Sequence, residues 1–302
     1  MSFVLTLVAE SGSGRLNDGA ADAVRTRANL AGFAFGPPRW LNKGEACDLP
    51  LGNIDPEPVR IWSDQALGDF QLDIGVTATE GRRKKFLIAD MDATIVVGET
   101  IDALAARAGS GDQVTEITAQ AMAGELDFKD ALRQRVATLK GLDAGVIDEV
   151  LGELEITQGA ATLVATMAKH GAATMLVSGG FTPFVSHVAN KLGFEFSQAN
   201  RLEIEDAKLT GRVVEPILDR DAKLAALHDL ADRVGLTPQD GLAVGDGAND
   251  LDMIAAAGLG AAWRAKPVLR ERADLKIDHG DLTALLYFQG YRARDFVRQD
   301  LS

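Results

Sequence analysis

The segment that most constrains the fold of this chain is residues 86–94, with the sequence FLIADMDAT. Its apolar run is typical of a strand buried on both faces, as in a parallel sheet, and it ends at Asp90 and Asp92. Open α/β sheets bind ligands beyond the carboxyl ends of their strands, so two acids here indicate a functional site. If the backbone stays extended, residues two apart point the same way and the carboxylates share one side.

Two neighbouring carboxylates repel each other, which favours either a bound metal ion or one ionised and one protonated member. An ionised aspartate can act as a nucleophile, and a protonated one can donate a proton. The simpler alternative is that an Asp caps the element that follows the strand. The spacing alone does not decide between these readings, so the rest of the chain has to.

The composition excludes several classes of function. Lys and Arg number 31 against 44 Asp and Glu, a net charge of −13, so we expect no nucleic-acid partner. The single cysteine, Cys47, allows no intrachain disulfide and argues against a zinc site. Residues 3–9 are apolar but short and lack a preceding basic segment, which predicts a strand and not a signal peptide. We expect no membrane span and a cytoplasmic protein.

Residues 1–80 are predicted to form a small α+β domain of their own. Residues 3–9, 59–62 and 69–76 favour strands, and residues 20–30 favour a helix. No cluster of catalytic residue types occurs in this region.

Residues 81–302 have the pattern of a second, α/β domain with an all-helical insert at about 98–154. An insert directly after a catalytic strand suggests a cap that closes over the site and excludes water. Helices are predicted in the insert at 100–108, 113–123, 128–140 and 143–154. After it, strands are predicted at 172–177, 242–244, 260–263 and 273–277, a β-hairpin at 201–215, and helices at 159–170, 182–192 and 222–234.

Three of the predicted strand ends carry polar clusters, which parallel strands bring to one edge of a sheet. These clusters are Asp90 with Asp92, Ser178-Gly179-Gly180, and Asp246 with Asn249 and Asp250. Carboxylates without nearby His or Cys favour a hard cation, Mg²⁺. Ser178 and the backbone N–H groups after it, at a predicted helix N-terminus, suit a phosphoryl group, as does Lys223. No Gly-rich loop of the nucleotide-hydrolysing type is present.

The helical insert carries a cation on its apolar face. That face of the predicted helix 128–140 presents Phe128, Leu132, Arg135 and Leu139. Arg135 can extend along the edge of the core into solvent. It can equally point into a cleft and bind a carboxylate. The pattern alone leaves both readings open.

Found together and in this order, the motifs resemble those of the haloacid dehalogenase (HAD) superfamily. The matching residues are Asp90-x-Asp92-x-Thr94, Ser178, Lys223 and Gly245-Asp246-Gly247-x-Asn249-Asp250. From about residue 84 to 285 the chain resembles the phosphoserine phosphatases more narrowly. That resemblance is carried by Glu99-Thr100-Ile101-Asp102, Met122, Phe128, Leu132-Arg133-x-Arg135-Val136, Val177-Ser178-Gly179-Gly180-Phe181 and Ala199-Asn200-Arg201-Leu202. It implies a HAD-like Rossmannoid parallel sheet with a helical cap.

The resemblance implies hydrolysis of O-phosphoserine to L-serine and phosphate, the last step of serine biosynthesis. Asp90 would attack phosphorus and form an aspartyl-phosphate, and Asp92 would protonate the leaving oxygen and later take a proton from water. Mg²⁺ would be held by Asp90, by the backbone carbonyl of Asp92 and by Asp246. Supporting positions would be Thr94, Gly180 and Asp250.

The resemblance also assigns the substrate contacts. Glu99 would bind the ammonium of the substrate and Arg135 its carboxylate, which favours the functional reading of Arg135. The remaining assignments are Ser178, Gly179 and Lys223 to the phosphate, Asn249 to the bound ligand and Phe128 to closure of the cap.

Ala93 departs from the family pattern, which usually has Ser there, and we expect a tuned but active site. The N-terminal region weakly resembles amino-acid-binding regulatory (ACT-like) domains. Two alternatives stay open: a phosphatase or phosphotransferase acting on another small phosphorylated amino acid such as phosphohomoserine, and a catalytically inactive amino-acid-binding protein. The sequence is compatible with a homodimer and leaves the oligomeric state open.

Overall fold

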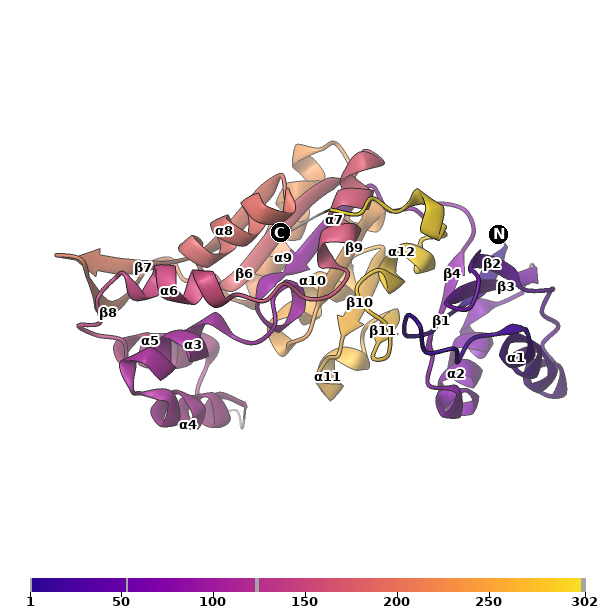
Figure 1. Ribbon diagram of the computed structural model, residues 1–302, viewed down its shortest axis with the longest axis horizontal. Coiled ribbons are helices and arrows are strands. Elements are labelled where there is room, and N and C mark those ends of the chain that lie inside the picture. The colour runs from indigo at the N-terminus through magenta and orange to yellow at the C-terminus, as the bar shows by residue number, and fades with distance from the viewer. Residues whose placement is uncertain (1, 53, 123–124, 300–302) are drawn as a thin grey trace.

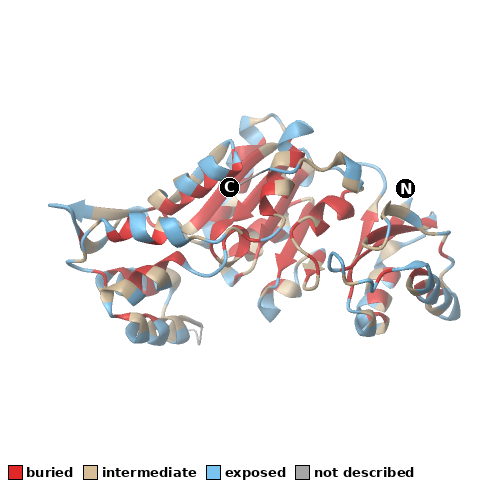
Figure 2. Ribbon diagram, viewed as in Figure 1, coloured by how far each residue is buried: buried red, intermediate tan, exposed pale blue. Residues whose placement is uncertain are grey.

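Two β-sheets organise the chain in the computed structural model, which describes residues 2–52, 54–122 and 125–299 (Figure 1). One sheet has four strands and lies towards the N-terminal end of the molecule. The other has seven strands and occupies the middle. Buried residues concentrate on the strands of both (Figure 2). No helix in the described part of the chain is long and apolar enough to cross a bilayer.

The smaller sheet has the strand order β2-β3-β1-β4, with every neighbouring pair antiparallel. Its elements follow a βαββαβ order, the split βαβ arrangement. They are β1 (Phe3–Val8), α1 (Asp18–Leu30), β2 (Arg39–Asn42), β3 (Ala46–Gly52), α2 (Pro56–Ala66) and β4 (Asp73–Ala78). Val24 of α1 and Val59 of α2 pack in one apolar cluster with Leu5 and Leu49 of the strands.

The strand predicted at 59–62 is wrong, because these residues lie within α2. Local signals explain the helix: the Asp55 side chain accepts a hydrogen bond from the Glu57 N–H, and a proline occupies the first turn. Val59 and Ser63, four residues apart, are the buried positions, which is a helical spacing. The predicted strand at 69–76 is shorter than expected at its start and begins at Asp73. Strands β2 and β3 were not foreseen.

The larger sheet has the order β11-β10-β9-β5-β6-β7-β8, and only the last pair is antiparallel. The prediction of an α/β parallel sheet is confirmed. Its strands are β5 (Phe86–Asp90), β6 (Ala173–Phe181), β7 (Phe196–Glu205), β8 (Lys208–Val214), β9 (Gly241–Gly245), β10 (Leu259–Trp263) and β11 (Leu275–Ile277). All five residues of β5 are buried, as expected.

Helices cover both faces of this sheet. Phe86 and Ile88 pack in one apolar cluster with residues of α9 and α10, whereas Leu87 and Ala89 pack in another with residues of α7 and α8. This alternation follows from the period of two in a strand. The helices are α7 (Ala160–Lys169), α8 (Thr182–Leu192), α9 (Arg220–Arg233), α10 (Leu251–Ala256), α11 (Pro267–Arg270) and α12 (Ala284–Phe288).

The four predicted cap helices are present as α3 (Thr100–Ala108), α4 (Gly111–Met122), α5 (Phe128–Ala137) and α6 (Val146–Glu153). Residue 123, the predicted end of the second, lies outside the described residues. Helices α3, α4 and α5 gather at one end of the molecule, below the β7–β8 hairpin (Figure 1). Three backbone hydrogen bonds join that hairpin to the cap: from Gly141 N to Leu209 O at 2.8 Å, from Leu209 N to Leu142 O at 2.9 Å and from Ala144 N to Ala207 O at 2.8 Å.

The two sheets are joined by buried polar contacts. The Arg82 guanidinium, on the segment between them, donates to both Asp48 carboxylate oxygens, at 2.6 and 2.8 Å, and to the Phe288 carbonyl at 2.7 Å. Arg82 and Asp48 expose only 10% and 9% of their side chains. Asp73 of β4 accepts backbone N–H groups from residues 278–280, just after β11. The N-terminal sheet is therefore fastened to the core at both of these points.

Candidate active site

Asp90 ends β5, and the chain then makes an irregular turn. Asp92 stays extended at φ −65° and ψ 137°, and Ala93 adopts a left-handed conformation at φ 53°. The Ala93 N–H donates to the Gly98 carbonyl at 2.8 Å, which closes the turn. Asp90 and Asp92 expose 4% and 7% of their surface and line the same pocket. The two carboxylates therefore lie on the same side of the chain, as expected for residues two apart on an extended backbone.

The Asp92 carboxylate is fixed on both oxygens. Oδ1 accepts the Thr100 N–H at 2.8 Å, and Oδ2 accepts the Ser178 hydroxyl at 2.9 Å. The Gly180 N–H in turn donates to Ser178 Oγ at 2.7 Å. Burial raises the pKa of Asp92, which these hydrogen bonds oppose. Ser178 therefore orients a carboxylate in this structure.

The prediction of a strand that ends in Ser178-Gly179-Gly180, followed by a helix from Thr182, is confirmed: β6 runs through the Ser-Gly-Gly segment to Phe181, and α8 begins at Thr182. The pairing of β6 with β7 shifts register between Ser178 and Phe181, so the segment is extended yet irregular. Glycine is required at position 180, because a Cβ there would lie 2.6 Å from Asp92 Oδ2. The strand rather than a helix thus positions these groups.

Lys223, in the first turn of α9, is buried behind the nucleophile candidate. Its Nζ donates to Asp90 Oδ1 at 2.6 Å and to Asp250 Oδ1 at 2.5 Å, and it exposes 2% of its side chain. Burial alone would lower the pKa of Lys223, but the charges of Asp250 and Asp90 raise it. Burial, followed by the charge of Asp250, raises the pKa of Asp90, and Lys223 opposes this. A charged lysine therefore sits between two acids.

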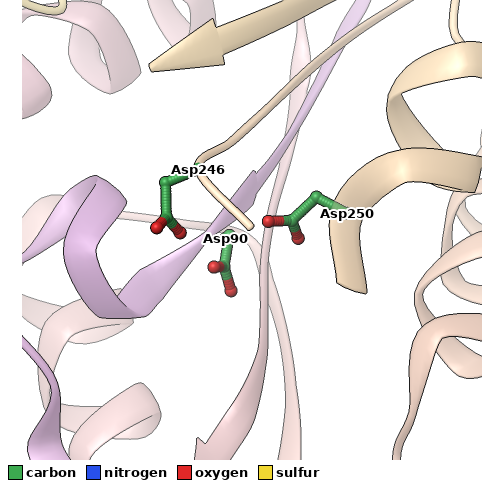
Figure 3. A group of neighbouring side chains, drawn as sticks. All are labelled: Asp90, Asp246 and Asp250. Carbon is green, nitrogen blue, oxygen red and sulfur yellow. The ribbon is translucent and has the colours of Figure 1, made fainter. Parts of the chain in front are cut away.

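Three carboxylates come together beyond the ends of β5 and β9. Asp90, Asp246 and Asp250 each offer an oxygen, and these oxygens lie within 4.8 Å of one another (Figure 3). Asp250 is held by the Gly247 N–H, which donates to its Oδ2 at 3.0 Å. Burial and the charge of Asp250 raise the pKa of Asp246 to about 6.

This group fits a metal ion. Carboxylate oxygens are hard ligands. Burial and then the charge of Asp250 raise the pKa of Asp90 and Asp246, and a divalent cation would relieve this crowding of negative charge. The group contains two of the three predicted metal-holding residues, Asp90 and Asp246. Its third member is Asp250, while the side chain of Asp92 is engaged by Thr100 and Ser178.

The pocket encloses about 540 Å³ of space, part of it open to solvent, between the sheet edge and the cap. The cap lines it with Phe128, Leu132 and Arg135 of α5 and with Glu99, which precedes α3. The core side contributes Asp90, Asp92, Ser178, Gly179, Gly180, Phe181, Asp246, Gly247, Asn249 and Lys266. The cavity therefore combines predicted catalytic residues with predicted substrate-binding residues.

The charged cap residues face this cavity. Arg135 is partly buried, its Nε has no hydrogen-bond partner, and it makes no ion pair within the described chain. Glu99 is accessible to solvent, but the protein around its carboxylate and the charge of Asp92 raise its pKa to about 7. The Phe128 ring lies over Gly179, where an added Cβ would be 3.0 Å from the ring.

Three predicted site residues lie behind the cavity and do not line it: Thr94, Lys223 and Asp250. Thr94 is fully buried, and its hydroxyl has no hydrogen-bond partner among the described residues. Lys266 and Thr100 line the pocket and were not predicted as site residues. Lys266 follows β10, the next strand along the same edge, so the rule that singled out the other strand ends would have found it.

Comparisons with known proteins concern the same part of the chain. A family profile described as haloacid dehalogenase-like hydrolase matches residues 87–255. The chain is similar to a phosphoserine phosphatase of Mycobacterium tuberculosis, with 46% identity over 244 residues, 80% of this chain. It spans 59% of the length of that curated relative.

Two solved structures are also similar. A HAD family hydrolase from Salmonella enterica serovar Typhi has a TM-score of 0.83 at 29% identity, and the match covers 95% of this chain and 97% of the other. A substrate-bound phosphoserine phosphatase has a TM-score of 0.65 at 40% identity, with 68% of this chain and 98% of the other covered. The first match includes the N-terminal sheet, because it covers nearly the whole chain.

Proposed function

The chain belongs to the haloacid dehalogenase-like hydrolase family, and on this premise we propose that it hydrolyses O-phosphoserine to L-serine and phosphate. The observation that carries the proposal is a single cavity lined by two kinds of group. Asp90 and Asp92 supply acids for phosphoryl transfer, while Glu99 and Arg135 supply opposite charges for an amino acid. A zwitterion that carries a phosphate matches all of them.

In the first step, Asp90 attacks phosphorus, the bond from phosphorus to the serine oxygen breaks, and an aspartyl-phosphate forms. Asp92 gives its proton to the departing serine oxygen. Its raised pKa favours the protonated form that this step requires. The hydrogen bonds from Thr100 and Ser178 hold the carboxyl group in place for the transfer.

In the second step, a water molecule attacks the phosphorus of the aspartyl-phosphate, and Asp92 accepts the proton of that water. The bond between phosphorus and Asp90 breaks, which regenerates the free carboxylate. Lys223 supplies positive charge next to Asp90 in both steps, from 2.6 Å.

We propose Mg²⁺ as the cofactor, held by Asp90 and Asp246 with the backbone carbonyl of Asp92, and supported by Asp250. Bound there, it would neutralise negative charge on the transferring phosphoryl group. The oxygen-only donor set supports a hard cation over a transition metal.

The substrate contacts follow from the cavity. Arg135 would bind the carboxylate of phosphoserine and Glu99 its ammonium, since both line the pocket from the cap side. Ionisation of Glu99 is needed for that contact. Gly179 and Asn249 would lie against the phosphate, and Phe128 would close the cap over Gly179.

We also propose that residues 1–80 form a domain separate from the catalytic unit, residues 81–302, with the cap at about 98–154. The absence of strands shared between the two sheets of the described chain supports this division. The βαββαβ order is compatible with the ACT-like regulatory role suggested by the sequence. A cytoplasmic location and homodimerisation remain parts of the same proposal.

The test is phosphate release and L-serine formation from phosphoserine, phosphothreonine and phosphohomoserine, with Mg²⁺ and with a chelator. We expect Mg²⁺-dependent activity on phosphoserine that Asp90→Asn abolishes. Asp229→Asn, at an exposed position on α9, is the matched control and should leave it unchanged. Preference for phosphohomoserine would establish the alternative substrate. No activity on any of the three would favour an amino-acid-binding protein, and activity that survives in Asp90→Asn would refute the nucleophile.

A further inference from the structure

The two lysines near the reacting groups differ in their freedom to bind a substrate. Lys223 is buried, and its ammonium is held at 2.6 and 2.5 Å by Asp90 and Asp250. It does not line the cavity. Lys266 lines the cavity, is exposed, and makes no ion pair within the described residues. Of the two, Lys266 is the one placed on the cavity wall, where it can meet an arriving anion.

The backbone fixes Lys266 at the sheet edge where the acids converge. It follows β10, which pairs in parallel with β9, the strand before Asp246. The Lys266 N–H donates to the Asp246 carbonyl at 3.1 Å. Lys266 is also the cap residue of α11, with Pro267 in the first turn of that helix. Its Cα is thus anchored beside the candidate metal group, while its long side chain is free to move.

The charge balance of the cavity creates a need for such a cation. Asp90, Asp92, Glu99 and Asp246 all line the cavity, in a chain with a net charge of −13. The cavity-lining cations in the described chain are Arg135, on the cap, and Lys266, on the core side. A phosphate dianion approaching the core side is repelled by the acids unless positive charge at the mouth compensates.

We propose that Lys266 is the residue that first contacts the phosphate group at the mouth of the pocket and that retains inorganic phosphate after hydrolysis. This rests on the proposed function and deepens it, because it assigns the external phosphate contact to a different lysine from the buried one.

The experiment measures binding of inorganic phosphate by calorimetry at one Mg²⁺ concentration and again at a higher one. The proteins are the wild type, Lys266→Met, Lys266→Arg and the control Lys169→Met, at an exposed lysine on the last turn of α7. We expect Lys266→Met to weaken phosphate binding by about three- to tenfold, as fits a charge-assisted contact partly screened by solvent. Lys266→Arg should restore most of the loss, and the control should match the wild type.

A second measurement follows phosphate binding as a function of salt concentration. Raising the ionic strength should weaken phosphate binding less in Lys266→Met than in the wild type, because one screened attraction has been removed. A residue with a merely structural role would leave this slope unchanged.

Three results would overturn the proposal. Lys266→Met could bind phosphate as tightly as the wild type, its weaker binding could disappear when Mg²⁺ is raised further, or the wild type could bind no phosphate. The second would mean that Lys266 acts only through Asp246 and the metal. Phosphate binding needs no turnover of phosphoserine. A Lys266 effect in a protein that does not hydrolyse phosphoserine would therefore refute the proposed substrate and leave the phosphate contact standing.

Discussion

Replacing Gly180 with alanine tests whether the position of Asp92 controls turnover. An added Cβ would lie 2.6 Å from Asp92 Oδ2 and 3.0 Å from Ser178 Oγ. Both atoms belong to the hydrogen bond that fixes the carboxyl group. To reach an ordinary van der Waals separation, the carboxylate must move by roughly 0.5–1 Å. Such a displacement takes the acid away from the serine oxygen that it is proposed to protonate.

The expected decrease in kcat can be estimated from the usual effect of displacing a catalytic group. A misplacement of about 1 Å lowers a rate by around 10²-fold, and a tenfold change in rate corresponds to about 1.4 kcal/mol. We therefore expect Gly180→Ala to lower kcat for phosphoserine by about 30- to 100-fold. KM should change by less than about threefold, because Arg135 and Glu99 are untouched and uniform binding is preserved.

Two further substitutions sharpen the assay. Gly152→Ala, on the exposed side of α6 with nothing within 4 Å of the added Cβ, should leave kcat unchanged. Gly179→Ala would place its Cβ 3.0 Å from the Phe128 ring, a movable group on the cap, so it should raise KM more than it lowers kcat. Steady-state phosphate release measures all three variants, and circular dichroism checks their folding. A folded Gly180→Ala with kcat within threefold of wild type would refute the positioning role of Asp92.

Three other predictions concern the cap and the junction between the sheets. The pKa of Glu99 is raised to about 7, so its side chain becomes protonated below that pH. KM for phosphoserine should therefore rise as the pH falls from about 8 to about 6. Glu99→Gln should flatten this profile. Arg82→Met leaves Asp48 buried without its partner and should lower the free energy of unfolding in urea by about 3–5 kcal/mol, whereas a loss below about 1 kcal/mol would contradict a buried pair. The exposed pair of Arg133 with Glu215, 2.8 Å apart, should show only a weak coupling in a double-mutant cycle, and high salt should remove it.

Sequence reasoning found the sheet because its signals are local. The buried run before Asp90 and the short apolar run of β9 each fix a strand and its polar end without knowledge of the rest of the fold. The N-terminal region gave weaker signals. There, Val59-Arg60-Ile61-Trp62 has strand-like composition, and only the Asp55 cap and Pro56 before it decide for a helix. The strand prediction considered only the composition of these four residues and not the helix-capping signal that precedes them.

The partners of the site residues depend on packing that the sequence does not display. The Ser178 hydroxyl donates to Asp92, 86 residues away in the chain, and the position of Ser178 after a strand does not reveal this partner. The ammonium of Lys223 bridges Asp90 and Asp250, and the place of Lys223 in a predicted helix does not reveal either partner. Motif order predicts which residues belong to the site, but the direction of each side chain is set by how α9 and β6 pack against β5.

The buried lysine also explains how three acids can stand so close. Asp90, Asp246 and Asp250 would repel one another at this largely buried sheet edge, and the ammonium of Lys223 offsets that repulsion for two of them. Asp246 lacks this contact, and its pKa is raised to about 6. Metal affinity should therefore fall as the pH drops through about 6, because Asp246 must lose its proton to act as a ligand. Asp246→Asn, which cannot titrate, would keep weak Mg²⁺ binding with a flatter dependence on pH. An unaltered pH profile in that variant would place the titrating ligand elsewhere.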